Sequence, residues 1–353
     1  MSVEDSDAPH IVFCGGGSGG HLVPSIAVLE SLRELDSRWT ATFLCSGRDV
    51  DRRILGSIDA PDRVVQLPIL SARPRLRYAV QVLRAIRCCR RELQRSSRSV
   101  VLGTGGFASV PGVLAAHWDR LPVALLEPNA VMGRANRKLR KHACVTFRGW
   151  GTLSTPDASE LVTGVPIRAP AVRSRRRDDR RTLLITGGSL GARRLNELVL
   201  DAATTVDLSE WRIIHQTGLE DERSCRERWS QLSCDVRVVS FLDDLAAAFQ
   251  SADLIVARGG AVTLAEIAAT GTASILVPLD GSADDHQRLN AECLSSCGAA
   301  ALVAAGDAPG MAAVVRQLTC DDVARESLGA AVRAMARPGA ARVIAEKLQG
   351  LVT

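Results

Sequence analysis

A histidine closes a run of small residues near the start of the chain, in the order Gly15-Gly16-Gly17-Ser18-Gly19-Gly20-His21. An apolar segment at 11–14 precedes the run and predicts a buried parallel strand, and apolar residues at helical spacing follow it. A strand, a glycine turn and a helix together present backbone N–H groups and a positive helix dipole to an anion. That dipole disfavours an imidazolium, so a neutral His21 is a candidate general base. A capping or loop histidine is the structural alternative.

Three more glycine turns follow apolar segments, so that each half of the chain contains two. They are Gly103-Thr104-Gly105-Gly106 after 100–102, Gly187-Gly188-Ser189 after 183–185, and Gly259-Gly260 after 254–256. This arrangement predicts a protein that handles phosphate groups.

The fourth turn continues into a helical pattern rich in small residues. Backbone N–H groups at Ala261, Val262 and Thr263 are placed to hold a diphosphate. Glu266, one turn further on, is placed to accept hydrogen bonds from two vicinal ribose hydroxyls. It could equally be a helix-start glutamate that stabilises the dipole by about 0.3–1 kcal/mol, and the sequence alone leaves both interpretations open.

Other polar residues are candidates for contacts with a phosphorylated sugar. Arg168 could pair with phosphate or stack on a base, and the Ser189 hydroxyl could donate to phosphate. The neutral amides suited to sugar hydroxyls are Asn129, Gln287 and Asn290. Each of these residues could also be an ordinary surface or capping residue.

Alternating strand and helix patterns run along all 353 residues, which suits two α/β domains. We expect doubly wound parallel sheets in residues 1–165 and 166–353, with the break near Gly164-Val165-Pro166 and a charged linker at 173–181. Two such sheets facing each other would gather the glycine turns around one cleft.

Composition narrows the chemistry. A net charge of +5 gives no reason to expect a nucleic-acid partner. Ten scattered cysteines without a Cys-x-x-Cys pair indicate reduced thiols rather than a zinc or redox site. The sequence has no convincing Asp-x-Asp metal signature and indicates neither metal nor cofactor. No charge-free apolar stretch reaches the ~18 residues of a spanning helix, so we expect a soluble protein that can touch a membrane surface.

The segment Pro68–Arg98 mixes apolar residues with nine arginines. It could lie on anionic lipid, or it could be a surface helix whose arginine stems cover apolar area.

A dinucleotide-binding domain has a similar first turn, but it needs an acidic residue at the end of its second strand. Here that strand runs into Ser46-Gly47-Arg48 instead, so a dehydrogenase is poorly supported.

Taken together, the motifs resemble those of the MurG family of peripheral membrane N-acetylglucosaminyltransferases, in the family's order and over essentially the whole chain. The matching segments are 15–24, 103–112, Glu127-Pro128-Asn129, 164–168, 187–196, 241–245, 258–266 and 285–291.

The resemblance implies a GT-B fold, which consists of two Rossmann-like domains with a cleft between them. It implies an inverting enzyme that moves N-acetylglucosamine from UDP-N-acetylglucosamine to lipid I through a β-1,4 bond, giving lipid II of peptidoglycan synthesis. The C-terminal half would bind the nucleotide sugar. The N-terminal half would bind the lipid-linked acceptor through the turn of Gly103, Thr104, Gly105 and Gly106, on the cytoplasmic side of the inner membrane. The helix at 340–350 packs back on the N-terminal domain in the family.

Site residues also follow from the resemblance. His21 would be the base, Asn129 and Gln287 would bind the transferred sugar, and Ser189 the diphosphate. The backbone of Leu242 would read uracil. Two groups would line the donor: Ser18, Gly19 and Gly20 beside the sugar, and Ala261, Val262, Thr263, Leu264, Ala265 and Glu266 along the diphosphate, sugar and ribose.

The chain departs from the family pattern at five positions, which are Phe107, Pro128, Val165, Leu190 and His286. Leu190 removes a polar group near the expected diphosphate. Rival functions are another GT-B lipid glycosyltransferase, a UDP-sugar 2-epimerase, and a nucleotide-sugar-binding module without turnover.

Overall fold

The computed structural model describes residues 8–17, 19–56, 62–68, 75–94, 96–151, 157–168, 180–188, 191–242, 244–279, 281 and 285–352, with the backbone only at 75–79. The chain divides into two compact units. Unit 1 consists of Met1–Arg168 together with Pro338–Thr353, and unit 2 consists of Ala169–Arg337. Unit 1 therefore combines the N-terminal half of the chain with its last residues.

Unit 1 contains a parallel sheet in the order β3-β2-β1-β4-β5-β6-β7. Its inner strands are buried along their whole length, as strands covered on both faces must be. The strands are β1 (His10–Cys14), β2 (Thr40–Cys45), β3 (Arg63–Gln66), β4 (Ser99–Gly103), β5 (Val123–Glu127), β6 (Val145–Arg148) and β7 (Glu160–Val162).

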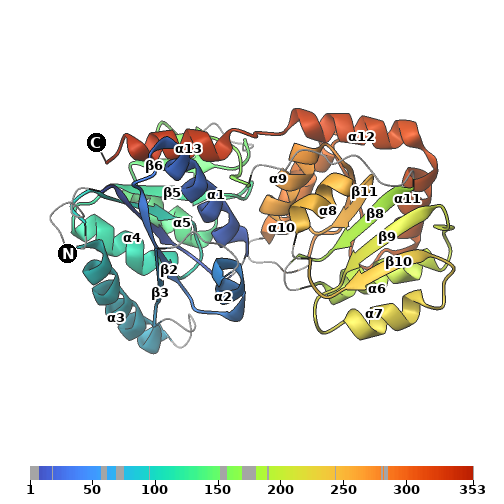
Figure 1. The fold of residues 1–353 in the computed structure, drawn as a ribbon, viewed down its shortest axis with the longest axis horizontal. Coiled ribbons are helices and arrows are strands. Elements are labelled where there is room, and N and C mark those ends of the chain that lie inside the picture. The colour runs from blue at the N-terminus through green and yellow to red at the C-terminus, as the bar shows by residue number, and fades with distance from the viewer. Residues whose placement is uncertain are drawn as a thin grey trace. The chain divides into compact units, whose positions relative to one another are not determined.

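Helices cover both faces of this sheet (Figure 1). They are α1 (Gly19–Leu35), α2 (Asp49–Gly56), α3 (Arg75–Leu93), α4 (Ser109–Trp118), α5 (Arg134–Leu139) and α13 (Ala340–Gln349), and a short 3₁₀ turn, η2, spans Arg140–His142. Helix α13 packs on α1, and its Ile344 and Leu348 join the buried cluster around Phe13 and Phe43. The end of the chain thus completes the core that supports α1.

Unit 2 repeats the architecture with a parallel sheet in the order β10-β9-β8-β11-β12-β13. The strands are β8 (Arg181–Thr186), β9 (Trp211–Gln216), β10 (Asp235–Val239), β11 (Leu254–Ala257), β12 (Ala273–Leu276) and β13 (Ala301–Leu302). The helices are α6 (Arg193–Ala203), α7 (Glu222–Trp229), α8 (Leu245–Ser251), α9 (Ala261–Thr270), α10 (His286–Ser295), α11 (Ala308–Cys320) and α12 (Asp322–Ala334).

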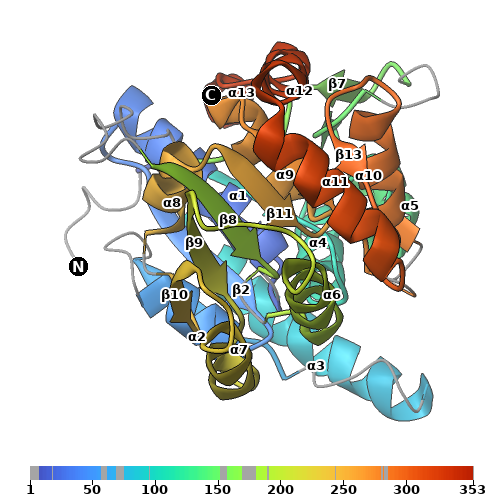
Figure 2. The same ribbon diagram turned by 90° about the vertical axis from the view of Figure 1, so that its right-hand side faces the viewer.

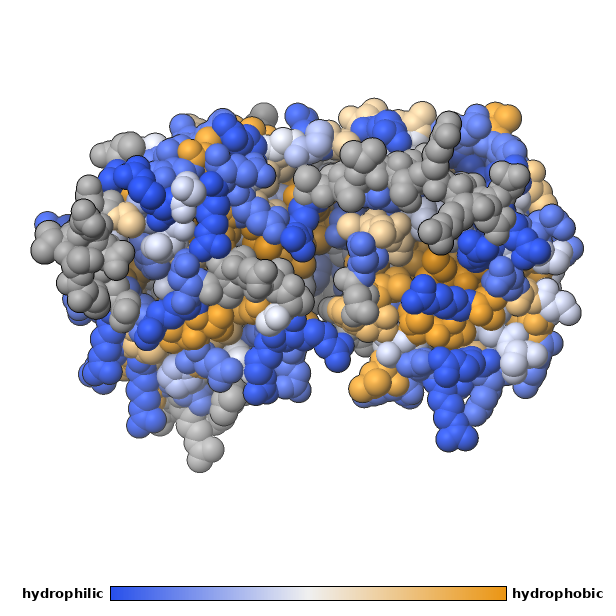
Figure 3. All heavy atoms as spheres, viewed as in Figure 1, coloured by the Kyte–Doolittle hydropathy of each residue, from blue (hydrophilic) through white to orange (hydrophobic). Residues whose placement is uncertain are grey.

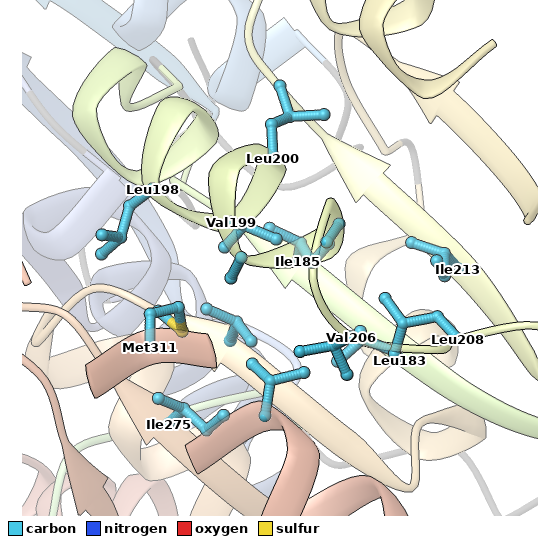
Figure 4. Packing of buried hydrophobic residues seen from close by; sticks show 14 of the residues in the cluster. Leu183, Ile185, Leu198, Val199, Leu200, Val206, Leu208, Ile213, Ile275 and Met311 are labelled. Atoms are coloured by element: carbon cyan, nitrogen blue, oxygen red, sulfur yellow. The ribbon is translucent and has the colours of Figure 1, made fainter. Parts of the chain in front are cut away.

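Helices α6 and α7 lie side by side on one side of the unit 2 sheet (Figures 1 and 2). Leu198 and Val199 of α6 pack with Ile185 of β8 and Met311 of α11 in one buried cluster (Figure 4). Aromatic residues make up only 3% of the chain, so aliphatic side chains dominate this core, together with Trp211 and Trp229.

Each sheet has one point where the strand order reverses, between β1 and β4 in unit 1 and between β8 and β11 in unit 2. The four glycine turns follow those four strands at their carboxyl ends. Ligands of doubly wound sheets bind at such reversal points. The fold therefore brings the turns together in pairs, one pair in each unit.

The predicted fold of two parallel-sheet α/β domains is confirmed. Strand β7 was not predicted from the sequence, because three residues at the edge of a sheet carry too short an apolar pattern to indicate a strand.

On the face drawn in Figure 3, hydrophilic residues dominate the region of α7, and hydrophobic residues are visible among hydrophilic ones elsewhere. Among the described residues, no helix has both the length and the apolar character to cross a bilayer.

Candidate functional site

The two glycine turns of unit 1 are held against each other. The backbone N–H of Thr104 donates to the carbonyl of Cys14 at 2.9 Å. A side chain at Gly15 would overlap Oγ1 of Thr104, so only glycine fits there. Gly105 and Gly106 have φ angles of +94° and +73°, which L side chains rarely adopt. The glycines thus allow two backbone turns to approach within contact distance.

His21, in the first turn of α1, lies at this contact and is half-buried. Its Nδ1 is 2.7 Å from the carbonyl oxygen of Thr104. Because a carbonyl only accepts, Nδ1 carries the proton and Nε2 carries the lone pair. A Cβ at Gly106 would lie 3.3 Å from Nε2, so this nitrogen faces the second turn. The arrangement suits a neutral imidazole that takes a proton through Nε2.

Asn129 is held by Glu127, a buried carboxylate at the end of β5. Oε1 of Glu127 accepts from the backbone and side-chain nitrogens of Asn129 at 3.1 and 2.9 Å. Oε2 accepts from Gly133 N at 2.8 Å and from Asn136 Nδ2 at 3.0 Å. Asn136 in turn lies against Gly105. No role was predicted for Glu127 or Asn136 from the sequence. The signal for Glu127 was its place as a polar residue at the carboxyl end of a strand.

Other predicted residues of unit 1 have mixed outcomes. Gly19 and Gly20 begin α1, and Gly103 ends β4. Arg168 forms an ion pair with Glu30 of α1, with 2.8 Å between Nη2 and Oε1. Its contact with phosphate stays a prediction. Ser18 lies outside the described residues, as do Ser189 and Leu190 of the third turn.

In unit 2 the third turn is held from β9. The Oγ1 of Thr186 accepts from Gly188 N at 3.1 Å, and Gln216 Nε2 donates to the carbonyl of Gly188 at 3.1 Å. Gly188 and Gly191 have φ angles of +78° and +73°. Two buried polar side chains, Thr186 and Gln216, therefore fix the N–H and the carbonyl of Gly188.

The fourth turn gathers the predicted amides. Asn290 Nδ2 donates to the carbonyl of Gly259 at 3.0 Å, and a side chain at Gly259 would overlap the carbonyl of Gln287. Gln287 Oε1 accepts from Leu279 N at 3.2 Å. Gly260 is the N-cap of α9 and supplies no capping side chain, so α9 offers the N–H groups of its first turn, at Ala261, Val262 and Thr263. Leu264, which is buried, and Ala265 continue this helix, and Leu242 lies beyond β10.

Glu266 stands one turn into α9 and is half-buried. Within the described part of the chain its carboxyl makes no hydrogen bond and no ion pair. Burial raises the pKa of Glu266 to about 7. A carboxyl that is poorly solvated and lacks an internal donor is suited to accept hydrogen bonds from a ligand.

Arg258 lies between β11 and the fourth turn, and no role was predicted for it from the sequence. A Cβ at Gly188 would lie 3.2 Å from its Nη2, so its guanidinium lies beside the third turn. Burial lowers the pKa of Arg258, and its side chain has no counter-ion among the described residues. A desolvated cation next to two glycine turns is suited to bind an anion. Its position directly before Gly-Gly was the available signal.

Comparisons with known proteins establish the family. Residues 11–146 match the glycosyltransferase family 28 N-terminal domain, and residues 182–339 match the glycosyltransferase family 28 C-terminal domain. The UDP-N-acetylglucosamine--N-acetylmuramyl-(pentapeptide) pyrophosphoryl-undecaprenol N-acetylglucosamine transferase of Stutzerimonas stutzeri is 33% identical, covering 96% of this chain and 98% of its own. The chain belongs to the MurG family. It is therefore a glycosyltransferase.

Solved structures agree with this assignment. MurG of Acinetobacter baumannii is 26% identical, with a TM-score of 0.79 over 97% of this chain and 99% of its own. The UDP-GlcNAc 2-epimerase of Neisseria meningitidis, solved with UDP-GlcNAc bound, has a TM-score of 0.70 over 97% of this chain and 100% of its own, at 14% identity. At that identity the likeness to the epimerase is one of fold alone.

A buried histidine, His215 of β9, links α7 to α6 by hydrogen bonds. Nδ1 of His215 accepts from Trp229 Nε1 at 2.9 Å, and Nε2 lies 3.1 Å from Oδ1 of Asn196. Asn196 then donates to Thr217 O and to Asp221. This chain of bonds requires a neutral ring with its proton on Nε2. Burial lowers the pKa of His215 to about 3.

We expect this histidine to make stability depend on pH. The pKa of His215 in the unfolded chain is about 6.5. Below that pH the unfolded state therefore binds a proton at His215 that the folded state does not bind. Stability should fall as the pH drops through 6.5 toward 3, by about 2 kcal/mol at about pH 5. Urea titrations at a series of pH values measure this loss. His215→Gln should flatten the dependence. Equal slopes in the parent and in His215→Gln would contradict the assignment.

Proposed function

We propose that this protein transfers N-acetylglucosamine from UDP-N-acetylglucosamine to the muramyl sugar of undecaprenyl-diphosphate-linked pentapeptide, lipid I, and so forms lipid II. The observation that carries the proposal is the similarity to curated relatives of this name along 96% of the chain. The site residues support it, because unit 1 contains a base and unit 2 contains the cation and the carboxyl that a nucleotide diphosphate requires.

The chemistry is an inverting displacement. Nε2 of His21 takes the proton from the acceptor hydroxyl, whose oxygen attacks the anomeric carbon on the face opposite UDP. The new bond is β-1,4, and the bond from the anomeric carbon to the diphosphate oxygen breaks with both electrons going to UDP. Negative charge then grows on the diphosphate, where the α9 N–H groups and Arg258 stabilise it.

The donor contacts are those that the family resemblance implies. In the proposal, Glu266 accepts from the ribose hydroxyls, and the first turn of α9 together with Ser189 holds the diphosphate. Asn129, Gln287 and Asn290 bind the sugar, and Leu242 reads the base through its backbone. Arg168 exchanges Glu30 for phosphate when the donor is bound.

The acceptor is lipid-linked, and α3 supports contact with a membrane. Val80, Leu83, Arg84, Arg87 and Arg91 are exposed and recur at spacings that place them along one side of the helix. Trp118, 55% exposed, ends the helix α4 that packs on α3. Apolar side chains beside arginines are suited to the interface of an anionic bilayer, so we propose a peripheral position at the cytoplasmic membrane surface.

His21→Ala should lower kcat by about 10²- to 10⁴-fold and leave the affinity for UDP unchanged, because only the proton acceptor is lost. The assay incubates labelled UDP-N-acetylglucosamine with a lipid I analogue and separates disaccharide product, epimerised donor and unreacted donor. His117→Ala is the matched control. A His21→Ala variant with parental turnover would rule out this base, and epimerised donor without disaccharide would rule out the transferase.

Glu266→Ala should weaken UDP binding about 10- to 100-fold, because two hydrogen bonds to a charged group are lost. In the parent, UDP affinity should fall as the pH drops below about 7, where the carboxyl of free Glu266 gains a proton. Calorimetry of Glu266→Gln should show a flatter pH dependence. Glu326→Gln, exposed on α12, is the control, and the ionisation of UDP itself is common to all proteins. If Glu266→Gln keeps the parental slope, Glu266 does not contact the ribose.

Replacing Arg84, Arg87 and Arg91 with glutamine should weaken binding to anionic vesicles at least about tenfold at low salt, since each arginine contributes about 1 kcal/mol at such a surface. Co-sedimentation with vesicles of increasing anionic lipid content measures this. The control replaces Arg223, Arg226 and Arg228 of α7, which removes the same charge from unit 2. Equal losses in both variants would show that net charge alone, rather than α3, governs membrane binding.

A further inference from the structure

Arg48 lies where the two glycine turns of unit 1 meet. It precedes α2, is exposed, and places its guanidinium carbon 5.6 Å from the centroid of the Phe107 ring, which follows the second turn. The Arg48 side chain also lies beside the first turn, because a Cβ added at Gly17 would lie 3.5 Å from its Nη1 and 3.7 Å from its Cδ. One cationic side chain therefore lies beside the first turn and over the ring of the residue that follows the second turn.

The first turn is shaped by a carboxylate behind it. Asp51 of α2 is 1% exposed, and its Oδ1 accepts from the backbone N–H of Gly17 at 2.6 Å. Its Oδ2 accepts from Ser46 Oγ at 2.7 Å and from the backbone N–H of Arg48 at 3.3 Å. The N–H of Gly17 is thereby committed inside the protein. The negative charge of Asp51 lies next to the turn and disfavours the binding of an anion there.

An anion at this turn consequently needs a cation from a side chain, and Arg48 is placed to supply it. In the described part of the chain its guanidinium makes no hydrogen bond and no ion pair, whereas Arg52, one turn further along α2, pairs with Asp49. A cation–π contact with Phe107 holds the guanidinium, and this contact uses none of its N–H groups as hydrogen-bond donors. The N–H edge of a guanidinium matches the paired oxygens of a phosphate group.

We propose that Arg48, held by Phe107, binds the diphosphate of the lipid-linked acceptor. The inference rests on the proposed function, from which it takes the acceptor, and it adds the residue that supplies the positive charge. Arg48 thus serves the acceptor in unit 1 as Arg258 serves the donor in unit 2. Asp51 has a positioning role, since it fixes both Gly17 and the backbone of Arg48.

A binding experiment tests the proposal without turnover. Inorganic pyrophosphate is titrated by calorimetry into the protein with saturating UDP present, which occupies the donor diphosphate site. The parent and Arg52→Gln should bind pyrophosphate equally, and Arg48→Gln should bind it at least about tenfold more weakly. Phe107→Leu should weaken binding and Phe107→Tyr should retain it. Equal affinity in the parent and Arg48→Gln, or no binding by the parent, would overturn the proposal. Thermal melting confirms that each variant is folded.

Kinetics and vesicles identify the source of the phosphate. Arg48→Gln should raise the KM for the lipid I analogue at least about tenfold, with an unchanged KM for UDP-N-acetylglucosamine and unchanged binding to anionic vesicles. Loss of vesicle binding with an unchanged acceptor KM would assign Arg48 to lipid headgroups and overturn the proposal. If the parent transfers no sugar, the proposed function fails, while the pyrophosphate titration still decides whether Arg48 binds a diphosphate.

Discussion

The hydrogen bond from Nδ1 of His21 to the carbonyl of Thr104 is the interaction on which unit 1 depends. It sets the tautomer, and it is possible only where α1 and the second turn are in contact. That contact requires β1 and β4 to be neighbours, although they lie far apart in sequence. It also requires glycine at 15, where a side chain would overlap Thr104, and positive φ angles at 105 and 106. A single hydrogen bond thus links the strand order, the glycine positions and the basicity of Nε2.

Unit 2 uses the same reversal of strand order for a different purpose. Its fourth turn lies between a cation and a carboxyl, Arg258 and Glu266, and burial displaces the pKa of each toward the neutral form. Neither group has an ionic partner among the described residues, and keeping poorly solvated groups in this way costs stability. A ligand that supplies a diphosphate and two hydroxyls removes both penalties, so its binding should stabilise unit 2 by mass action.

Much of this could be predicted from the sequence, because apolar runs and glycine turns report strands and their carboxyl ends directly. The parallel sheets, the four turns, and the places of His21 and Glu266 on the helices that follow the first and fourth turns were predicted from that pattern. Other features depend on contacts that no local pattern records. Asp51 reaches Gly17 across 34 residues, and Glu127 holds Asn136 from the next helix. The pairing of Arg168 with Glu30 joins residues 138 positions apart. Such partners are fixed by tertiary packing and not by spacing.

The two buried carboxylates of unit 1 have different neighbours. Asp51 accepts from Gly17 of the first turn, whereas Glu127 accepts from Asn129, Gly133 and Asn136, of which Asn136 lies against Gly105 of the second turn. A buried carboxylate fixes a turn well because it accepts several N–H or O–H bonds at once, but it also places negative charge next to a turn that would otherwise attract an anion. Rigid turns and anion binding therefore oppose each other here. A separate cation beside the turns makes the two compatible, and the guanidinium of Arg48 lies beside Gly17 and over the Phe107 ring.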